Sequence, residues 1–264
     1  MSRKSRRILI TGAGSGIGRA IAIEASRRGM RVALCGRREQ PLAETYAALR
    51  PGDHIAIPCD VLNANDRRRL IQVVGQRWGA IDVLINNAGL IQFGPVRELV
   101  DGDAERLVAT NLTAPICMVR DCLQLLTRGV KPQIANMGSL LGSIPYPLFA
   151  AYSATKSGLH GFSTALRREL APLKIGVTHI SARGTDTESA QILQPYAKSL
   201  EMRFDKPEAV AVAVLDGLAQ RKNEIYPKGI ERLFMAAQAI TPAIVDRAIA
   251  SQLRRASAEG LPIH

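Results

Sequence analysis

The sequence has few cysteines, few aromatic residues and no long hydrophobic run, and each shortage excludes a class of protein. Its four cysteines are scattered and form no C-x-x-C pair, so a disulfide scaffold is not expected. The four histidines lack metal-ligand spacing, and we therefore expect no catalytic metal. No apolar stretch reaches the about 18 residues of a membrane-spanning helix, and residues 1–7 lead into a strand without the apolar core of a signal peptide. These absences predict a cytoplasmic protein with no transmembrane segment.

Positive charge dominates the sequence, whose formal net charge is +12. Such a surface can attract nucleic acid or anionic lipid without specificity. The arginine clusters are dispersed over expected helices, however, and only 4% of the residues are aromatic, which is too few for a base-stacking platform. We interpret the clusters as solvated helix faces and expect no specific nucleic-acid partner. The alternative, a nucleic-acid-binding protein, predicts association with any duplex that weakens strongly with salt.

Aliphatic segments alternate along the chain with amphipathic helical segments, which is the pattern of a parallel sheet covered on both faces. With 264 residues and 47% hydrophobic content, residues 1–264 can form a single α/β domain with a substantial core. The expected strands are 7–11, 31–35, 54–58, 83–87, 133–137, 176–181 and 224–226. The expected helices include 40–49, 67–77, 103–126, 152–171 and 207–220. The pattern therefore predicts a doubly wound sheet.

A glycine-rich turn, Thr11-Gly12-Ala13-Gly14-Ser15-Gly16-Ile17-Gly18, follows the first expected strand, and an apolar stripe at helical spacing begins within it. A strand, a glycine turn and a helix together make a phosphate site, because free N–H groups and the positive end of the helix dipole converge there. The spacing of the glycines differs from the common dinucleotide pattern G-x-G-x-x-G. The turn therefore predicts a phosphate site of a different type.

Tyr152 and Lys156 lie four residues apart in the expected helix 152–171, and Ser139 precedes them in the sequence. Residues i and i+4 share one face of a helix, so Lys156 can place its ammonium beside the Tyr152 phenol. A phenol titrates near pH ~10, and a nearby cation favours the phenolate. The spacing predicts a lowered Tyr152 pKa and an acid/base role. By itself a Tyr-x-x-x-Lys sequence occurs by chance in many chains and is more often an amphipathic tyrosine on a surface helix.

With these motifs in this order, the first roughly 190 residues resemble the classical short-chain dehydrogenase/reductase family. The resemblance rests on the glycine turn, on Asn86-Asn87-Ala88-Gly89 and on the Tyr152–Lys156 pair. It implies a Rossmann fold with seven parallel strands in the order 3-2-1-4-5-6-7. It also implies a catalytic tetrad of Asn111, Ser139, Tyr152 and Lys156, acting on a small-molecule carbonyl or alcohol.

The resemblance further implies which residues hold a dinucleotide. Asp60 and Val61 would bind the adenine, although Asp60 could instead cap a helix. Asn86 is expected to do no more than tie strands together. The expected cofactor residues are Gly12, Ser15, Gly16, Ile17, Gly18, Arg37, Arg38, Asp60, Val61, Asn87, Ala88, Gly89, Tyr152, Lys156, Gly184 and Thr187.

The end of the second expected strand indicates which dinucleotide is used. A carboxylate there binds the ribose 2′-hydroxyl of NAD, whereas arginine accommodates the 2′-phosphate of NADP. Gly36 occupies that position and is followed by Arg37 and Arg38, whose guanidiniums suit a phosphate. Ser15 argues the other way, because many NADP-dependent members carry a basic residue there. The sequence therefore predicts NADP, mainly through Arg37.

Three further expectations concern the second half of the chain. Arg183 stands where the family has proline, which predicts a flexible, charged turn before a substrate lid at 184–206 and suggests that Arg183 could contact a substrate anion. The largely apolar segment 140–149 favours a lipophilic substrate. Residues 229–264 are expected to form a helical extension that covers the open end of the sheet. A substrate cap, an oligomer contact and a membrane contact are alternatives.

Self-association as a homodimer or homotetramer is expected through helices 103–126 and 152–171, as is common in the family. Their apolar residues would form the contact: Val108, Leu112, Val119, Leu159, Phe162 and Leu166. The alternative is that the protein is not an enzyme but a regulator that keeps the fold and binds cofactor without turnover. Arginine in place of the family's proline at position 183 leaves this alternative open.

Overall fold

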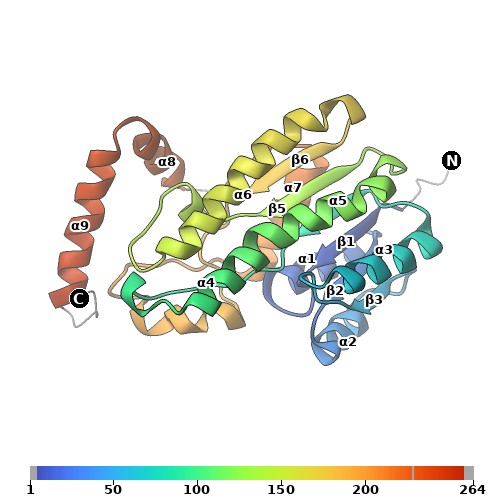
Figure 1. Cartoon of the computed structure of the whole chain (residues 1–264), viewed down its shortest axis with the longest axis horizontal. Coiled ribbons are helices and arrows are strands. Elements are labelled where there is room, and N and C mark those ends of the chain that lie inside the picture. Colours follow the sequence, from blue (N-terminus) through green and yellow to red (C-terminus); the bar gives the residue numbers. More distant parts are fainter. Residues whose placement is uncertain (1–4, 228, 259–264) are drawn as a thin grey trace.

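The computed structural model describes residues 5–227 and 229–258, and Figure 1 shows them built around one sheet. The sheet has seven parallel strands in the order β3-β2-β1-β4-β5-β6-β7, which confirms the predicted doubly wound fold. Each expected strand is present, with ends that differ by one residue at most. The bounds are β1 Arg7–Thr11, β2 Arg31–Gly36, β3 Ile55–Pro58, β4 Val83–Asn86, β5 Gln133–Met137, β6 Gly176–Ile180 and β7 Glu224–Ile225.

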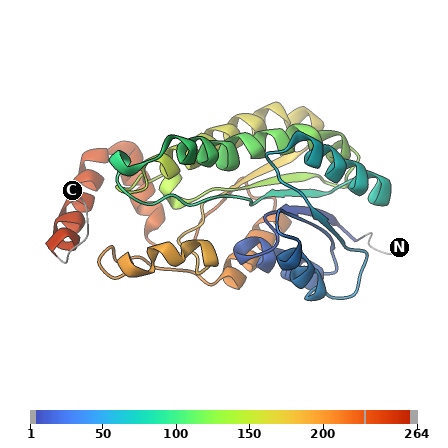
Figure 2. The same cartoon turned by 60° about the horizontal axis from the view of Figure 1, so that its bottom comes forward.

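Helices cover both faces of the sheet, as Figure 2 shows most clearly. One face packs against α1 (Gly16–Arg27), α2 (Glu39–Ala47) and α7 (Pro207–Ala219); the other packs against α3 (Ala64–Trp78), α5 (Ala114–Thr127) and α6 (Ala150–Glu169). Side chains of β1 alternate between the two layers: Ile8 and Ile10 enter the first and Leu9 the second. Successive side chains of a strand point to opposite faces, so a strand whose two faces are both covered is hydrophobic at every position.

The helix expected at 103–126 is interrupted. The structure has α4 (Asp101–Val108), a π-helical turn at Ala109–Thr113, and then α5. Pro115, in the first turn of α5, has no N–H to donate to a carbonyl of the preceding turn, and the helix widens just before it. The widened turn contains Asn111, whose side chain is buried.

Six apolar residues were expected to form the contact between copies of the chain, and for three of them the prediction is wrong. Val119, Leu159 and Leu166 are at most 5% exposed because they pack into the protein's own core. Val108 is 46% exposed, and Leu112 and Phe162 are partly buried. Helical periodicity indicated an apolar face correctly, but it could not tell whether the sheet or a second subunit covers that face.

The C-terminal segment forms α8 (Glu231–Ile240) and α9 (Pro242–Ala258), which stand at one end of the molecule in Figure 1. The described part of this pair contributes no residue to either layer of the sheet, and the expected cover over the open end of the sheet stays a prediction, with residues 259–264 outside the described residues. Leu253 and Ala256 of α9 pack against loop residues that include Leu148 and Leu200, in a cluster separate from the two sheet layers. No residue of α8 is buried. Within the described ranges no helix is long and apolar enough to cross a membrane, and the cytoplasmic location stays a prediction.

Candidate active site

The glycine turn between β1 and α1 forms a cradle that only glycine can build. Gly12 and Gly16 adopt left-handed backbone conformations with φ of 64° and 53°. A Cβ atom on Gly12 would lie 2.9 Å from the Cα of Ala88, and one on Gly18 would collide with the carbonyl oxygen of Gly12. The N-cap residue of α1, Ser15, makes no side-chain cap, and the first turn holds no acidic residue. The amide groups at this helix start are therefore left for an anion, so the cradle fits the pyrophosphate of a dinucleotide.

The loop after β4 is fixed against this turn by hydrogen bonds. The Oγ1 of Thr11 accepts from the backbone N–H groups of Asn87 and Ala88, both at 3.0 Å. The Nδ2 of Asn87 donates to the carbonyl oxygens of Thr11 and Gly12, at 3.0 and 3.1 Å. Asn87 thus holds the turn in shape, a role that the sequence alone did not indicate.

Two adjoining cavities lie over this edge of the sheet. One has a volume of about 340 Å³ and is lined by Ser139, Tyr152 and Lys156 together with the glycine turn, Gly184 and Thr187. The other has a volume of about 210 Å³ and is lined by Arg37, Arg38, Asp60 and Val61. Gly12, Ser15, Ala88 and Gly89 line both cavities. Of the expected site residues, only Gly18 and Asn111 line neither.

The environment of Tyr152 differs from the expectation. Burial raises the pKa of Tyr152 to about 12, and a side-chain hydrogen bond with Ser139 offsets part of that rise. The Nζ of Lys156 lies 5.6 Å from the centre of the Tyr152 ring. The predicted lowering of this pKa is therefore wrong for the cofactor-free protein, because removing the phenolate from water outweighs the nearby cation.

Lys156 is 6% exposed, and its Nζ donates to the carbonyl oxygen of Met137 at 2.8 Å. Burial lowers the pKa of Lys156 to about 8. Among the residues that the structure describes, no carboxylate forms an ion pair with this ammonium, whose hydrogen-bond acceptor is a neutral carbonyl. The site therefore contains a buried lysine that can change its charge close to physiological pH.

Asn111 joins the β4 loop to α6. Its Oδ1 accepts from the N–H of Leu90 at 2.8 Å, and its Nδ2 donates to the Leu90 carbonyl and to the Thr155 hydroxyl at 2.9 and 3.2 Å. A Cβ atom on Gly89 would lie 3.2 Å from Asn111 Oδ1 and 3.7 Å from Lys156 Nζ. A side chain at position 89 would therefore crowd both of these polar groups.

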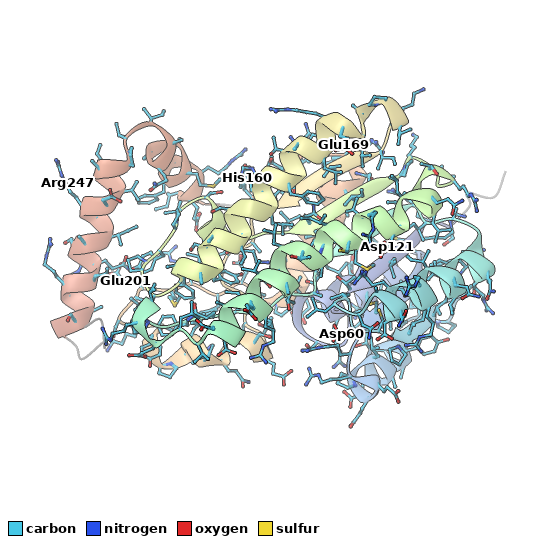
Figure 3. The ribbon with its side chains drawn as sticks, viewed as in Figure 1. Asp60, Asp121, His160, Glu169, Glu201 and Arg247 are labelled. Atoms are coloured by element: carbon cyan, nitrogen blue, oxygen red, sulfur yellow. The ribbon has the colours of Figure 1, made fainter. Side chains whose placement is uncertain are left out.

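At the second cavity the structure distinguishes the roles of several polar residues. Asn63 caps α3 by accepting from the N–H groups of Asn65 and Asp66, so the alternative that Asp60 caps this helix is wrong. The carboxylate of Asp60 instead accepts from the N–H of Leu62 at 2.9 Å. Asp60, labelled in Figure 3, lies two residues after the end of β3.

The two arginines of the second cavity differ in their partners. Arg37 is exposed and makes no ion pair with any residue that the structure describes. Arg38 pairs with Glu188, at the start of a 3₁₀ helix at Glu188–Tyr196. No sequence pattern indicates this pair, because 150 residues separate its members.

Arg183 is held by carboxylates. Its guanidinium lies 3.5 Å from Asp205 and 3.2 Å from Glu231 of α8. The N–H of Asp205 donates to the carbonyl oxygen of Gly184 at 2.8 Å, so backbone pairing joins the two ends of the segment 184–205. The expected flexible turn is thus anchored, and the two carboxylates around Arg183 disfavour a substrate anion there.

A chain of buried amides and hydroxyls holds α6 against the sheet. The Nδ2 of Asn86 donates to Asn136 Oδ1 at 2.8 Å, and Asn136 Nδ2 donates to Ser163 Oγ at 2.9 Å. Ser163 Oγ lies 3.3 Å from Nδ1 of His179, whose pKa is lowered to about 3 by burial, so this ring is neutral. Asn86 ties strands together as expected. Asn136 was missed, although an asparagine within an apolar strand is a usable signal.

The doubly wound sheet, the glycine cradle and the Tyr152–Lys156 pair together define a nucleotide-binding oxidoreductase. The family model for short chain dehydrogenases matches residues 6–196, and the chain belongs to this family.

Individual relatives agree with this assignment. The chain is 29% identical over 262 residues to YxnA, an uncharacterised oxidoreductase of Bacillus subtilis, covering 92% of this chain and 71% of that protein. It is 32% identical over 227 residues to a 3β-hydroxysteroid dehydrogenase of Mediterraneibacter gnavus, covering 82% of each. Among solved structures, an actinorhodin polyketide ketoreductase variant with NADPH has a TM-score of 0.79 at 31% identity, covering 87% of this chain and 98% of that one. A Burkholderia phymatum family member with NAD, at 21% identity and a TM-score of 0.83, covers 92% and 96% and supports the fold alone.

Proposed function

We propose that the protein is an NADP(H)-dependent oxidoreductase that interconverts a lipophilic carbonyl compound and its secondary alcohol. The observation that carries the proposal is the placement of Tyr152, Ser139 and Lys156 around one cavity that adjoins the glycine cradle. The second cavity, with Arg37 and Arg38, supports the choice of dinucleotide. A bound nicotinamide dinucleotide supplies or accepts the hydride in this chemistry.

In the proposed mechanism Tyr152 is the acid/base. Its phenol donates a proton to the carbonyl oxygen of the substrate as negative charge develops there, and Ser139 donates a hydrogen bond to the same oxygen. Lys156 places positive charge near the phenol and would hold the ribose hydroxyls of the nicotinamide half of a bound dinucleotide. Asn111 ties the β4 loop to α6. In the proposed mechanism it would act with water to connect Lys156 to solvent, so that the proton given up by Tyr152 is replaced. The same groups act in reverse during alcohol oxidation.

The cavity wall supports a lipophilic substrate. Apolar residues from four segments line it: Leu90, Ile91, Leu140, Leu141, Phe149, Leu193, Met202 and Phe204. The names of a related hydroxysteroid dehydrogenase and of a similar polyketide ketoreductase agree with a bulky, largely apolar substrate. A panel of lipophilic ketones and aldehydes, assayed by oxidation of NADPH, tests the proposal. Binding of NADPH without turnover across a broad panel would favour the cofactor-binding regulator instead.

We expect NADP(H) to bind more tightly than NAD(H), and Arg37→Ala to remove most of that difference. Arg37 lines the second cavity and forms no ion pair within residues 5–227 and 229–258, so its guanidinium is available to a 2′-phosphate. Titration of both cofactors into wild type and Arg37→Ala measures the preference. Arg50→Ala changes an exposed arginine that lines neither cavity and serves as the matched control. Equal affinities for the two cofactors in wild type would refute the assignment.

We also propose that the protein is a homodimer or homotetramer through the outer faces of α4, α5 and α6. Val108 and Ile116 remain 46% and 40% exposed there, which supports a contact smaller than the sequence suggested. Sedimentation velocity at micromolar concentration is expected to show an oligomer that Ile116→Asp shifts toward monomer. Val130→Asp, at an exposed turn outside these helices, is the control. A wild type that sediments only as monomer contradicts the prediction.

A further inference from the structure

Arg38, one of the two arginines proposed to bind the cofactor's 2′-phosphate, already forms an ion pair with the carboxylate of Glu188. The guanidinium of Arg38 donates to both carboxylate oxygens of Glu188, with Nη2–Oε2 and Nη1–Oε1 distances of 3.1 and 3.4 Å. Both side chains are largely exposed, 59% for Arg38 and 60% for Glu188. The pair therefore uses the two-pronged geometry in which arginine binds a phosphate, at a position that solvent and ligand can reach.

Glu188 belongs to a segment that lies across both cavities. The next residue, Ser189, lines the cavity of Arg37 and Arg38 and also the cavity of Tyr152 and Lys156. The preceding residue, Thr187, lies over the glycine turn, since a Cβ atom on Gly16 would be 3.0 Å from the Thr187 methyl carbon. The ion pair thus fastens the start of the proposed substrate lid to the N-cap residue of α2.

We infer that Glu188 is a specificity-determining residue whose carboxylate competes with the cofactor's 2′-phosphate for Arg38 and so limits the preference for NADP(H) over NAD(H). The inference rests on the proposed cofactor assignment. The guanidinium fork that holds the two oxygens of Glu188 cannot hold two phosphate oxygens in the same way at the same time. NAD(H) has a hydroxyl at this position, needs no guanidinium there, and leaves the ion pair intact.

Electrostatics gives this competition its direction. When the 2′-phosphate takes Arg38, the carboxylate of Glu188 loses its counter-ion and faces a second anion nearby, so part of the binding free energy of the phosphate is offset. The effect is limited because exposed ion pairs are weak in water and screened by salt. A neutral glutamine at position 188 keeps the size and polarity of the side chain while removing both the competition and the repulsion.

The test measures dissociation constants of NADPH and NADH, by the fluorescence of the bound reduced nicotinamide, in wild type and Glu188→Gln at low ionic strength. NADPH is expected to bind about two- to five-fold more tightly to Glu188→Gln, with NADH unchanged. The gain should shrink as salt is raised. Glu201→Gln is the matched control, since Glu201 forms a similarly exposed pair with Arg255, at 3.3 Å and with exposures of 65% and 66%, near α9 (Figure 3).

Several outcomes overturn the inference. Unchanged or weaker NADPH binding in Glu188→Gln overturns it, and so does an equal gain for NADH, which would indicate movement of the lid without phosphate selectivity. In an Arg38→Ala background the part of the gain that comes from competition is lost, so the gain from Glu188→Gln should shrink; if it persists in full, Glu188 does not act through Arg38.

The cofactor assignment fails separately. If wild type prefers NADPH, Arg37→Ala loses that preference and Glu188→Gln changes nothing, then only the competition is wrong. If wild type binds both cofactors equally and Glu188→Gln still binds NADPH more tightly than wild type does, the competition between Glu188 and the phosphate is supported. The assignment of NADP as the preferred cofactor is then refuted.

Discussion

Replacing Tyr152 with phenylalanine is expected to slow carbonyl reduction about 10²–10⁴-fold while NADPH binds almost as it does to wild type. The substitution removes only the phenol oxygen, which lies in the buried site and shares a hydrogen bond with Ser139. Because burial raises the pKa of Tyr152 to about 12, the phenol keeps its proton through the neutral range and can donate it. Steady-state turnover and NADPH titration on the same preparation separate the two effects.

Tyr146→Phe provides a matched control for this substitution. Tyr146 is a second tyrosine near the site, its pKa is also raised to about 12 by burial, and its hydroxyl makes no hydrogen bond within the described part of the chain. It packs with Leu148 and Leu253 instead of lining the cavity of Tyr152. Turnover in Tyr146→Phe should stay near that of wild type. Wild-type turnover in Tyr152→Phe would refute the mechanism and leave the family assignment untouched.

Lys156→Met is expected to lower kcat/KM about 10²-fold or more and to weaken cofactor binding as well. The substitution removes the ammonium beside Tyr152 and the proposed ribose contact, whereas Tyr152→Phe removes only the proton donor. Methionine keeps most of the buried volume, so the fold is expected to persist. Lys222→Met, an exposed lysine beyond α7, is the control. A Lys156→Met variant that loses turnover with unchanged cofactor affinity would contradict the ribose contact.

The same variant tests the buried charge through stability. The pKa of Lys156 is about 8 in the folded protein against an ordinary value of 10.5, so between these pH values the unfolded chain binds more protons than the folded one. The free energy of unfolding then rises with pH across that window, and below pH 8 the full cost of burying the charge is present. The Tm of wild type relative to Lys156→Met is therefore expected to increase from pH 8 to pH 10.5. A pH-independent difference would mean that Lys156 titrates normally.

The order of elements and the shape of the glycine turn could be predicted from the sequence because they depend on local rules. An alternation of aliphatic and amphipathic segments predicts a doubly wound sheet, and each strand end was found within one residue. The turn from Gly12 to Gly18 needs left-handed and close-packed backbone, which glycine alone supplies. The four-residue spacing of Tyr152 and Lys156 fixes a common helix face wherever the helix packs.

Tertiary structure decided what depends on residues far apart in the chain. The pKa of Tyr152 rises instead of falling, because desolvation is set by everything packed around the ring. Val119 and Leu166 are core residues because the sheet covers the helix face that could equally have met another subunit. The pairs Arg38–Glu188 and Arg183–Glu231 exist only once the chain has folded. The spacing of apolar residues along a helix or strand specifies which of its faces is buried. Which element covers that face, and which pKa shifts and ion pairs result, is decided only by the assembled fold.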